Sequence, residues 1–230
     1  KKLITDEDLT PLSVMVLINA VYFKAQWDKT FNESRSKEDN FYSFDSQVKA
    51  EFMHQTQRFK YYSDNMIQAV EIPYYARKAS IHVFLPKNQK SFRKFIEKLD
   101  NDYFEKIKEK SKYRQVNIKL PKFKTKSRLY LEKHLSEAGM PKAFRNDADF
   151  SGMSKSTRIA IDKVIHQSYI DLNEDGTEAA AATAVVMKRT SAVPSGKPLD
   201  FKADKPFIYL IKDNETNRVI FMGQLVNPQK

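Results

Sequence analysis

The sequence predicts a globular protein of the α+β class, in which many strands combine with few helices. The chain has 230 residues, 41% of them hydrophobic, and its 16 Phe, 11 Tyr and one Trp can build a packed core. Segments with strand character outnumber those with helical periodicity, and the two kinds do not alternate as in a doubly wound parallel sheet. Neither an internal repeat nor a linker is evident, so we expect a single domain over residues 1–230.

The expected strands are rich in β-branched and aromatic residues and are bounded by Pro, Asn, Asp or Gly. In the first, Ser13–Phe23, an almost continuous apolar run predicts a strand that is buried on both faces. The other strand candidates are Ile67–Pro73, Ser80–Leu85, Gln115–Leu120, Ile159–Leu172, Phe207–Ile211 and Val219–Leu225. The chain is therefore expected to be rich in strands.

Two segments show the spacing of an amphipathic helix. In Ser91–Lys110, the apolar residues recur on one side, with Lys or Glu between them. The second segment, Leu129–Ala138, is followed by Gly139 and Pro141, which end helices. We expect one long helix and one short helix.

The residues that usually carry enzymatic chemistry are absent or scattered. The chain has no cysteine, and none of its glycines forms a phosphate-binding loop. Ser91 and Lys94 fit a Ser-x-x-Lys pattern, but the partner motifs of acyl-serine enzymes do not follow. Four histidines lack the close spacing of metal ligands, namely His54, His82, His134 and His166. We therefore expect no metal, no cofactor and no enzymatic activity.

The formal net charge of +11 is concentrated between Lys87 and Arg128. Such a surface attracts polyanions, but motifs of nucleic-acid-binding folds are not evident, so we expect no nucleic-acid partner. No apolar stretch approaches the roughly 20 residues that span a bilayer, so we expect no membrane partner. The first residues show neither an initiating Met nor a signal core, which indicates that the chain begins inside a longer precursor.

The segment from Asp171 to Gly196 combines a turn sequence, four consecutive alanines and a run of Thr and Val residues. Ala179–Ala182 favour a helix, whereas the Thr and Val residues that follow favour a strand. This conflict disappears if the segment exists in two states, as an exposed loop and as a strand inserted into a sheet. Small side chains such as Thr177 would let that strand enter without overpacking.

Four motifs then resemble those of the serpins, a family of serine protease inhibitors. Glu174–Ala184 matches the hinge motif of the inhibitory members residue for residue. Leu17–Trp27 with Phe31 resembles a central-sheet strand, Phe201–Tyr209 resembles the C-terminal signature, and Phe221–Pro228 resembles the final strand. The motifs follow the family order along nearly the whole chain, whereas the N-terminal helices of the family have no counterpart here.

The resemblance implies the serpin fold, with a large mixed or antiparallel central sheet, further sheets and packed helices. This chain would carry only the C-terminal portion of that single domain, with its reactive-centre loop at about 174–198. The implied function is that of a suicide substrate: a protease cuts the loop, an acyl-enzyme forms, and the hinge inserts into the central sheet with the protease still attached. The implied hinge residues are Glu174, Gly176, Thr177, Glu178, Ala179, Ala180, Ala181, Ala182 and Thr183.

Three further positions match residues that the family uses where its sheet opens. Asn19 and His166 match a pair that is hydrogen-bonded beneath the opening sheet, and Trp27 matches the residue at the insertion point. The alternative is that these three residues serve only in ordinary core packing. The resemblance favours the family role, because all three lie inside matching motifs.

The scissile bond is open between two positions. The commonest loop length of the family places it between Thr190 and Ser191, which suits an elastase-like enzyme. A shift of one residue places it between Arg189 and Thr190, which suits a trypsin-like enzyme whose pocket carboxylate pairs with Arg. We favour Arg189, because a buried guanidinium–carboxylate pair discriminates more strongly than a Thr methyl group.

The sequence also suggests partners and a location. Asn32 and Asn214 begin glycosylation sequons, and the C-terminal tail resembles that of secreted serpins, so we expect an extracellular, monomeric glycoprotein. Heparin-like glycans are expected near the end of the long helix, at Lys106, Lys108, Lys110, Lys112 and Arg114. The rival functions are a non-inhibitory serpin that acts as carrier or chaperone, and a basic module that binds polyanions.

Overall fold

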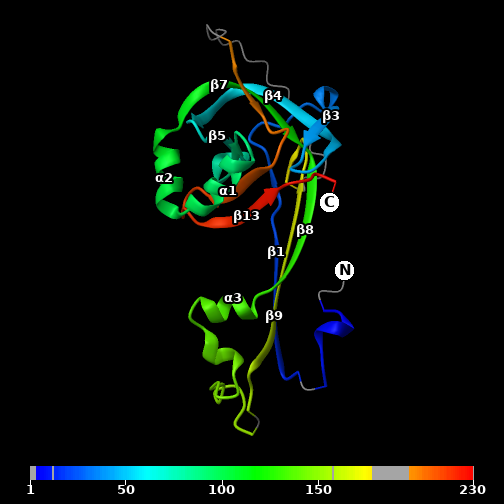
Figure 1. Cartoon of the computed structure of the whole chain (residues 1–230), viewed down its shortest axis with the longest axis vertical. Coiled ribbons are helices and arrows are strands. Elements are labelled where there is room, and N and C mark those ends of the chain that lie inside the picture. The colour runs from blue at the N-terminus through cyan, green and yellow to red at the C-terminus, as the bar shows by residue number, and fades with distance from the viewer. Residues whose placement is uncertain (1–3, 12, 157, 178–196, 230) are drawn as a thin grey trace. The chain divides into compact units, whose positions relative to one another are not determined.

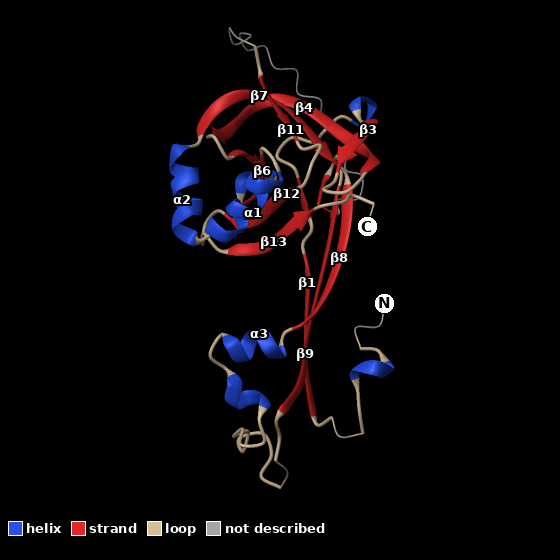
Figure 2. Ribbon diagram, viewed as in Figure 1, coloured by secondary structure: helices blue, strands red, loops and turns tan. Residues whose placement is uncertain are grey.

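The computed structural model describes residues 4–11, 13–156, 158–177 and 197–229. The chain divides into two compact units, which are described separately. Unit 1 contains residues 1–23 and 125–170, and unit 2 contains residues 24–124 and 171–230. Strands dominate the described residues and helices are few and short (Figure 2), so the predicted α+β class is confirmed.

Unit 2 is built on an eight-stranded sheet with the order β11-β7-β4-β5-β6-β12-β13, to which β3 adds by pairing with β4. All neighbours are antiparallel except β11 and β7, which are parallel. The long strands β4 and β7 run side by side and curve together (Figure 1). The strands are β3 (Lys37–Tyr42), β4 (Gln47–Ser63), β5 (Ile67–Pro73), β6 (Ala79–Pro86), β7 (Lys112–Pro121), β11 (Leu199–Lys202), β12 (Phe207–Asp213) and β13 (Val219–Leu225).

Two helices of unit 2, α1 (Gln89–Lys98) and α2 (Asn101–Lys110), bury their apolar sides against the sheet. The expected single helix over 91–110 is wrong. The Asp100 side chain accepts a hydrogen bond from the backbone N–H of Tyr103, 2.7 Å away, and so caps a second helix at the point where the first has ended. The core beneath them consists of Ile67, Ala69, Phe84, Phe92, Phe95, Phe104, Ile107, Ile208 and Leu210.

Short elements complete unit 2. The 3-10 helices are η2 (Glu33–Arg35) and η3 (Tyr75–Arg77), and the two-residue strands are β2 (Ala25–Gln26) and β10 (Gly176–Thr177). The two short strands pair with each other and not with the large sheet.

Unit 1 contains a ladder of long strands. β1 (Met15–Tyr22) pairs in parallel with β9 (Ile161–Leu172), and β8 (Phe123–Tyr130) pairs with the other edge of β9. The strand expected at Ser13–Phe23 is present, but its expected burial on both faces is wrong. Most residues of β1 are exposed; Leu17, Ile18 and Tyr22 are 43%, 38% and 57% exposed.

The helices of unit 1 are short: η1 (Asp6–Asp8), α3 (Glu132–Glu137) and η4 (Pro141–Phe144). The helix expected from Leu129 begins only at Glu132, because the residues up to Tyr130 extend β8.

A buried carboxylate, Asp8, fastens η1 to β8. It accepts hydrogen bonds from the Thr5 backbone N–H at 2.5 Å and the Tyr130 hydroxyl at 2.9 Å, and it pairs with Arg128. The Thr5 backbone hydrogen bond and these neighbours hold the pKa of Asp8 below its usual range.

Within the described ranges, no helix has both the length and the apolar character needed to cross a membrane. The same part of the chain holds no group of three acidic or histidine side chains arranged to bind a metal ion.

Candidate functional site

The short strand β10 is the structured beginning of the loop segment singled out in the sequence. Gly176 pairs with Gln26, and Thr177 pairs with Ala25 on one side and with Leu172 of β9 on the other. Thr177 therefore already occupies a position in a sheet ladder, between two strands.

Gly176 is needed for the close approach of these strands. Its φ of +155° is a value that residues with a side chain rarely adopt. A Cβ atom added here would collide with the carbonyl oxygen of Ala25 and would lie 2.7 Å from the Cα of Gln26. Because both contacts are to backbone atoms, a rotamer change could not relieve them.

Thr177 is fully buried, and its hydroxyl group contacts Tyr74, one of a cluster of three aromatic residues. The Tyr74 and Thr177 hydroxyls lie 2.7 Å apart and share a hydrogen bond. Trp27 stacks on Tyr74 with a centroid distance of 4.5 Å, and Phe31 meets the Trp27 ring edge-on at 6.0 Å. Burial raises the pKa of Tyr74, so its hydroxyl stays protonated at neutral pH.

Trp27 also holds the turn that precedes β10. Its indole N–H donates to the carbonyl oxygen of Asn173 at 2.9 Å, and its backbone N–H donates to the carbonyl oxygen of Asp175 at 2.8 Å. Within the turn, the Asn173 side-chain oxygen accepts hydrogen bonds from the backbone N–H groups of Asp175 and Gly176, at 3.0 and 3.3 Å. The turn is thus held both by hydrogen bonds from Trp27 and by hydrogen bonds to its own Asn173 side chain.

Glu174 anchors the same turn by charge, and its side chain is only 6% exposed. The carboxylate accepts a hydrogen bond from the Ser36 hydroxyl and pairs with the Lys122 ammonium at 3.3 Å. Lys122 also pairs with Glu51 at 3.0 Å. Burial alone would raise the pKa of Glu174, but the hydrogen bond from Ser36 and the charge of Lys122 outweigh it and lower that pKa.

Asn19 and His166 lie in unit 1, directly opposite each other in the parallel ladder of β1 and β9. Asn19 is exposed and His166 is partly exposed. Among the described residues, no hydrogen bond joins the two side chains. The structure therefore brings the pair together without the contact that the resemblance implied.

Other predicted residues lie outside the described residues. These are the hinge residues Glu178, Ala179, Ala180, Ala181, Ala182 and Thr183, and the bond residues Arg189, Thr190 and Ser191.

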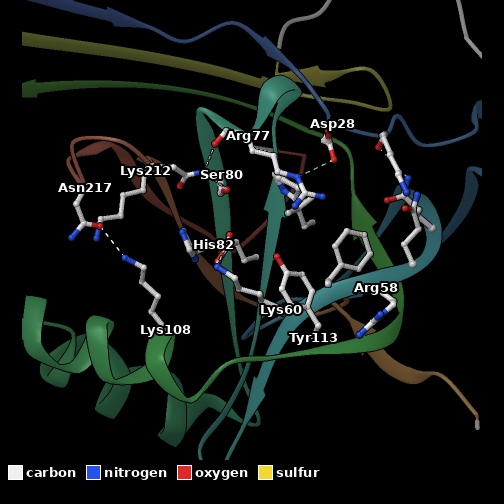
Figure 3. Close-up of a pocket in the computed structure, with 18 residues that line it drawn as sticks. Asp28, Arg58, Lys60, Arg77, Ser80, His82, Lys108, Tyr113, Lys212 and Asn217 are labelled. Carbon is white, nitrogen blue, oxygen red and sulfur yellow. Dashed lines mark hydrogen bonds and ion pairs between the residues drawn. The ribbon is translucent and has the colours of Figure 1, made fainter. Parts of the chain in front are cut away.

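Of the five basic residues predicted to bind glycans, Lys106, Lys110, Lys112 and Arg114 are exposed. Lys108 instead turns toward Glu105, at 3.3 Å, and Asn217, at 3.1 Å; Figure 3 shows the contact with Asn217.

The two sequons differ in what their amide groups do. Asn32 is exposed, and its side-chain oxygen accepts hydrogen bonds from the backbone N–H and hydroxyl of Ser34, at 3.0 and 2.8 Å. The amide nitrogen of Asn214 donates to the Arg77 carbonyl oxygen at 2.8 Å and the Ser80 hydroxyl at 2.9 Å. A glycan on Asn214 would replace one of the two amide hydrogens and so remove at least one of these hydrogen bonds, so Asn32 is the better acceptor.

Sequence reasoning missed three residues that hold the hinge, namely Ser36, Tyr74 and Lys122. Each reaches the hinge from a segment more than 50 residues away, apart from any recognisable motif. The one local signal was Pro73, which ends β5 and places Tyr74 next to Trp27, its partner in an isolated bridge.

Comparison with known proteins agrees with this arrangement. The family model described as "Serpin (serine protease inhibitor)" matches residues 1–228. A serpin-like protein of Thermococcus kodakarensis is 39% identical over 221 residues, which cover 96% of this chain and 51% of that protein. The leukocyte elastase inhibitor of Equus caballus is 33% identical over 227 residues, covering 94% of this chain and 59% of that protein.

The crystal structure of the thermophilic serpin tengpin in its native state superimposes with a TM-score of 0.86 at 31% identity, covering 98% of this chain and 58% of that one. The chain therefore belongs to the serpin family and has the fold of the corresponding part of a serpin. It spans 51% to 59% of the length of these relatives.

Proposed function

We propose that the intact protein inhibits serine proteases as a suicide substrate. The observation that carries this proposal is the position of Thr177: it is small, fully buried and already paired between β2 and the end of β9. If the residues after Thr177 insert as a strand, they can continue the existing pairing of Thr177. The family membership of the chain and the alanine-rich hinge sequence that follows support the same conclusion.

In the proposed reaction, the hydroxyl of the protease serine attacks the scissile carbonyl carbon in the loop. A serine ester forms, the peptide C–N bond breaks, and the released amine leaves with the proton carried by the base of the protease. The new strand then inserts, and the distorted protease no longer hydrolyses the ester. Each new backbone hydrogen bond contributes about 0.5–1.5 kcal/mol to insertion.

Insertion requires the parallel ladder of β1 and β9 to separate. The register of this ladder comprises eight residue pairs, one of which is Asn19 with His166. We infer that this pair stabilises the sheet when the inserted strand is in place. The exposure of Asn19 in the closed ladder leaves its amide available for a new partner.

The test is to substitute Thr177 and look for a covalent complex. Thr177→Arg would bury a cation in the ladder, so we expect a panel of serine proteases to cleave the variant without forming a complex that survives a denaturing gel. Thr177→Ser keeps the size class and the hydroxyl group, so it should form the complex as the unsubstituted protein does. Covalent complexes that persist in Thr177→Arg would contradict the insertion step. If the unsubstituted protein forms none, the proposed function itself is wrong.

We propose a trypsin-like target that cuts between Arg189 and Thr190. An elastase-like target that cuts between Thr190 and Ser191 is the alternative, and its support is that one relative is named a leukocyte elastase inhibitor. Mass spectrometry of the peptide released from the complex distinguishes them. A peptide that begins at Thr190 supports the first bond, and one that begins at Ser191 supports the second.

We also propose that the protein is secreted and glycosylated at Asn32. Asn32 is exposed and Asn214 uses its amide nitrogen in two hydrogen bonds. Glycosidase treatment of the secreted protein should lower its mass, and Asn32→Gln should abolish that change. An unchanged mass loss in Asn32→Gln, with its disappearance in Asn214→Gln, would contradict this assignment.

We propose heparin-like glycans as a second partner, bound by the exposed residues Lys106, Lys110, Lys112 and Arg114. Replacing all four by Gln should lower the NaCl concentration that elutes the protein from heparin, because the contacts are electrostatic. Elution at an unchanged concentration would remove this proposal.

A further inference from the structure

The segment that precedes β1 lies across the ladder that has to open for insertion. β9 lies between β1 and β8 in this sheet (Figure 1). Residues 5–11 lead toward β1, yet the buried carboxylate of Asp8 contacts Arg128 and Tyr130 of β8. The segment therefore crosses β9 to reach the strand on its far edge. Residues 5–11 together with Ser13 are called the strap below.

The strap is also bonded to β9 itself. The Lys163 ammonium group donates to the carbonyl oxygen of Glu7 at 3.0 Å, and the Ser13 hydroxyl group donates to the Asp162 carboxylate. Asp162 lies at the irregularity that shifts the register between the first two pairs of the ladder. The bond from Ser13 thus closes the end of the ladder at which β1 and β9 both begin.

The hinge lies at the other end of β9, where Thr177 pairs with Leu172, the last residue of that strand. Ile161, the first residue of β9, lies eleven residues before Leu172, so an antiparallel strand that continues this pairing would place residue 188 opposite Ile161. Such a strand fills the whole ladder and moves β1 away from β9 by about 4.8 Å, the spacing of neighbouring strands. Complete insertion therefore reaches the end that the strap closes.

The strap loses contacts when β1 moves. Its anchor at Asp8 stays with β8 and β9, whereas Ser13 lies two residues before β1 and moves with that strand. A hydrogen bond does not survive a displacement of several Å, so the bond from Ser13 to Asp162 breaks. The turn in which the Ser13 backbone N–H donates to the Thr10 carbonyl oxygen at 2.9 Å has to unwind. If it does not, Asp8 has to leave Arg128.

The anchor at Asp8 is well bonded but not fully satisfied. The Asp8 carboxylate is buried and also accepts hydrogen bonds from the Thr5 backbone N–H at 2.5 Å and the Thr5 hydroxyl at 2.8 Å. Arg128 binds it through Nη2 alone, and not through the two nitrogens of a bidentate contact. The Nε of Arg128 is buried and has no hydrogen-bond partner among the described residues. Because a buried ion pair that leaves a donor unsatisfied gains little net free energy, this anchor can be released at a modest cost.

We propose that the strap restrains the β1–β9 ladder at the end away from the hinge and so sets the rate at which a strand inserts completely. This inference rests on the proposed inhibitor function and adds a second point of control to it. A strand that is halted at the strap leaves the ladder partly filled, so the attached protease has more time to hydrolyse its ester and leave. Asp8 and Ser13 are therefore positioning residues, which act through the ladder.

Uptake of a free peptide by the intact protein tests the strap without a protease. A fluorescent synthetic peptide with the sequence of residues 178–188 can fill the same gap, and fluorescence polarisation follows its rate of uptake. Asp8→Asn removes the charge of the anchor, so we expect uptake at least about fivefold faster. Ser13→Ala removes only the bond to Asp162 and should speed uptake about threefold. Because Ser13 is partly exposed, this second variant keeps the test valid if Asp8→Asn does not fold.

Two matched controls lie in unit 1 outside the strap. Asp147 is exposed and pairs with Arg145 at 3.0 Å, so Asp147→Asn removes a comparable charge. Ser151→Ala removes an exposed hydroxyl group next to Asp149. Both should leave the rate of peptide uptake unchanged. A third control, Phe95→Leu in the core of unit 2, lowers the urea midpoint and measures how far a general loss of stability speeds uptake.

Unchanged uptake in Ser13→Ala and in folded Asp8→Asn would overturn the proposal, and so would the absence of uptake in every variant. Uptake by Phe95→Leu as fast as that by Asp8→Asn would assign the effect to general instability and overturn it as well. The covalent complex with a serine protease, measured in parallel, tests the inhibitor function separately. If the complex forms while the strap variants take up the peptide no faster, the strap is wrong and the inhibitor function stands. If uptake is accelerated and no complex forms, the strap is right and the inhibitor function is wrong.

Discussion

The turn that leads into β10 is held by aromatic packing on one side and by charge on the other. On the first side, Tyr74 shares a hydrogen bond with the buried Thr177, and Trp27 stacks on the Tyr74 ring. On the second, the Glu174 carboxylate accepts a hydrogen bond from Ser36 and pairs with Lys122, which also forms an ion pair with Glu51. Apolar burial is insensitive to pH and to salt in comparison with an ion pair. The aromatic side therefore fixes the register of the hinge, and the charged side is the adjustable restraint.

The largest effect is expected when the aromatic side is removed. Trp27→Ala deletes a ring that is 1% exposed. It also removes the hydrogen bond from the indole N–H to the turn, so that only the hydrogen bond from the backbone N–H of residue 27 remains. We expect a loss of about 3–5 kcal/mol, seen as a lower urea midpoint of the intact protein. Tyr75→Ala, at a tyrosine that is 71% exposed, is the control and should stay within about 0.5 kcal/mol. Similar midpoints for both variants would mean that packing does not hold this side.

A somewhat smaller effect is expected from crowding the two short strands. Gly176→Ala places a methyl group against the backbone of Ala25 and Gln26 and should cost about 1–3 kcal/mol. The control is Gly152→Ala, where an added Cβ meets nothing within 4 Å. Thermal unfolding measures both, and equal melting temperatures would show that β10 moves away without cost.

On the charged side, Glu174→Gln removes the pairing with Lys122 and should cost about 1–3 kcal/mol. Because the folded-state pKa of Glu174 lies below the value of 4.5 for an ordinary Glu, its contribution is present above that pH and is lost as the pH falls through the folded value. The difference in urea midpoint between the unsubstituted protein and Glu174→Gln should therefore shrink on acidification. A difference that stays constant from pH 7 to pH 3 would contradict the ionic account.

The smallest effect is expected from Tyr74→Phe, which keeps the stacked ring and removes the hydroxyl group shared with Thr177. One such hydrogen bond contributes about 0.5–1.5 kcal/mol. The urea midpoint should fall slightly at every pH between 5 and 8, because the pKa of Tyr74 is raised by burial. A loss as large as that of Trp27→Ala would show that the hydroxyl pair, and not the packing, governs this side.

Periodicity predicted several strands well and missed others. The strands at Ile67–Pro73 and Val219–Leu225 have the predicted bounds, because their apolar runs end at clear turn residues. The long strand Gln47–Ser63 was missed, because its alternation of apolar and polar residues over Val48–Phe52 is interrupted by the polar run His54–Arg58. The segment 91–110 was predicted as one helix, because its apolar spacing continues across the cap at Asp100.

By itself, the sequence determined the α+β class, the serpin family and the local properties of the hinge. Gly176 and Thr177 could be identified because a glycine conformation and a small side chain are properties of single residues within a motif. Only the tertiary structure decided what holds that hinge, because Ser36, Tyr74 and Lys122 meet it through contacts between distant segments.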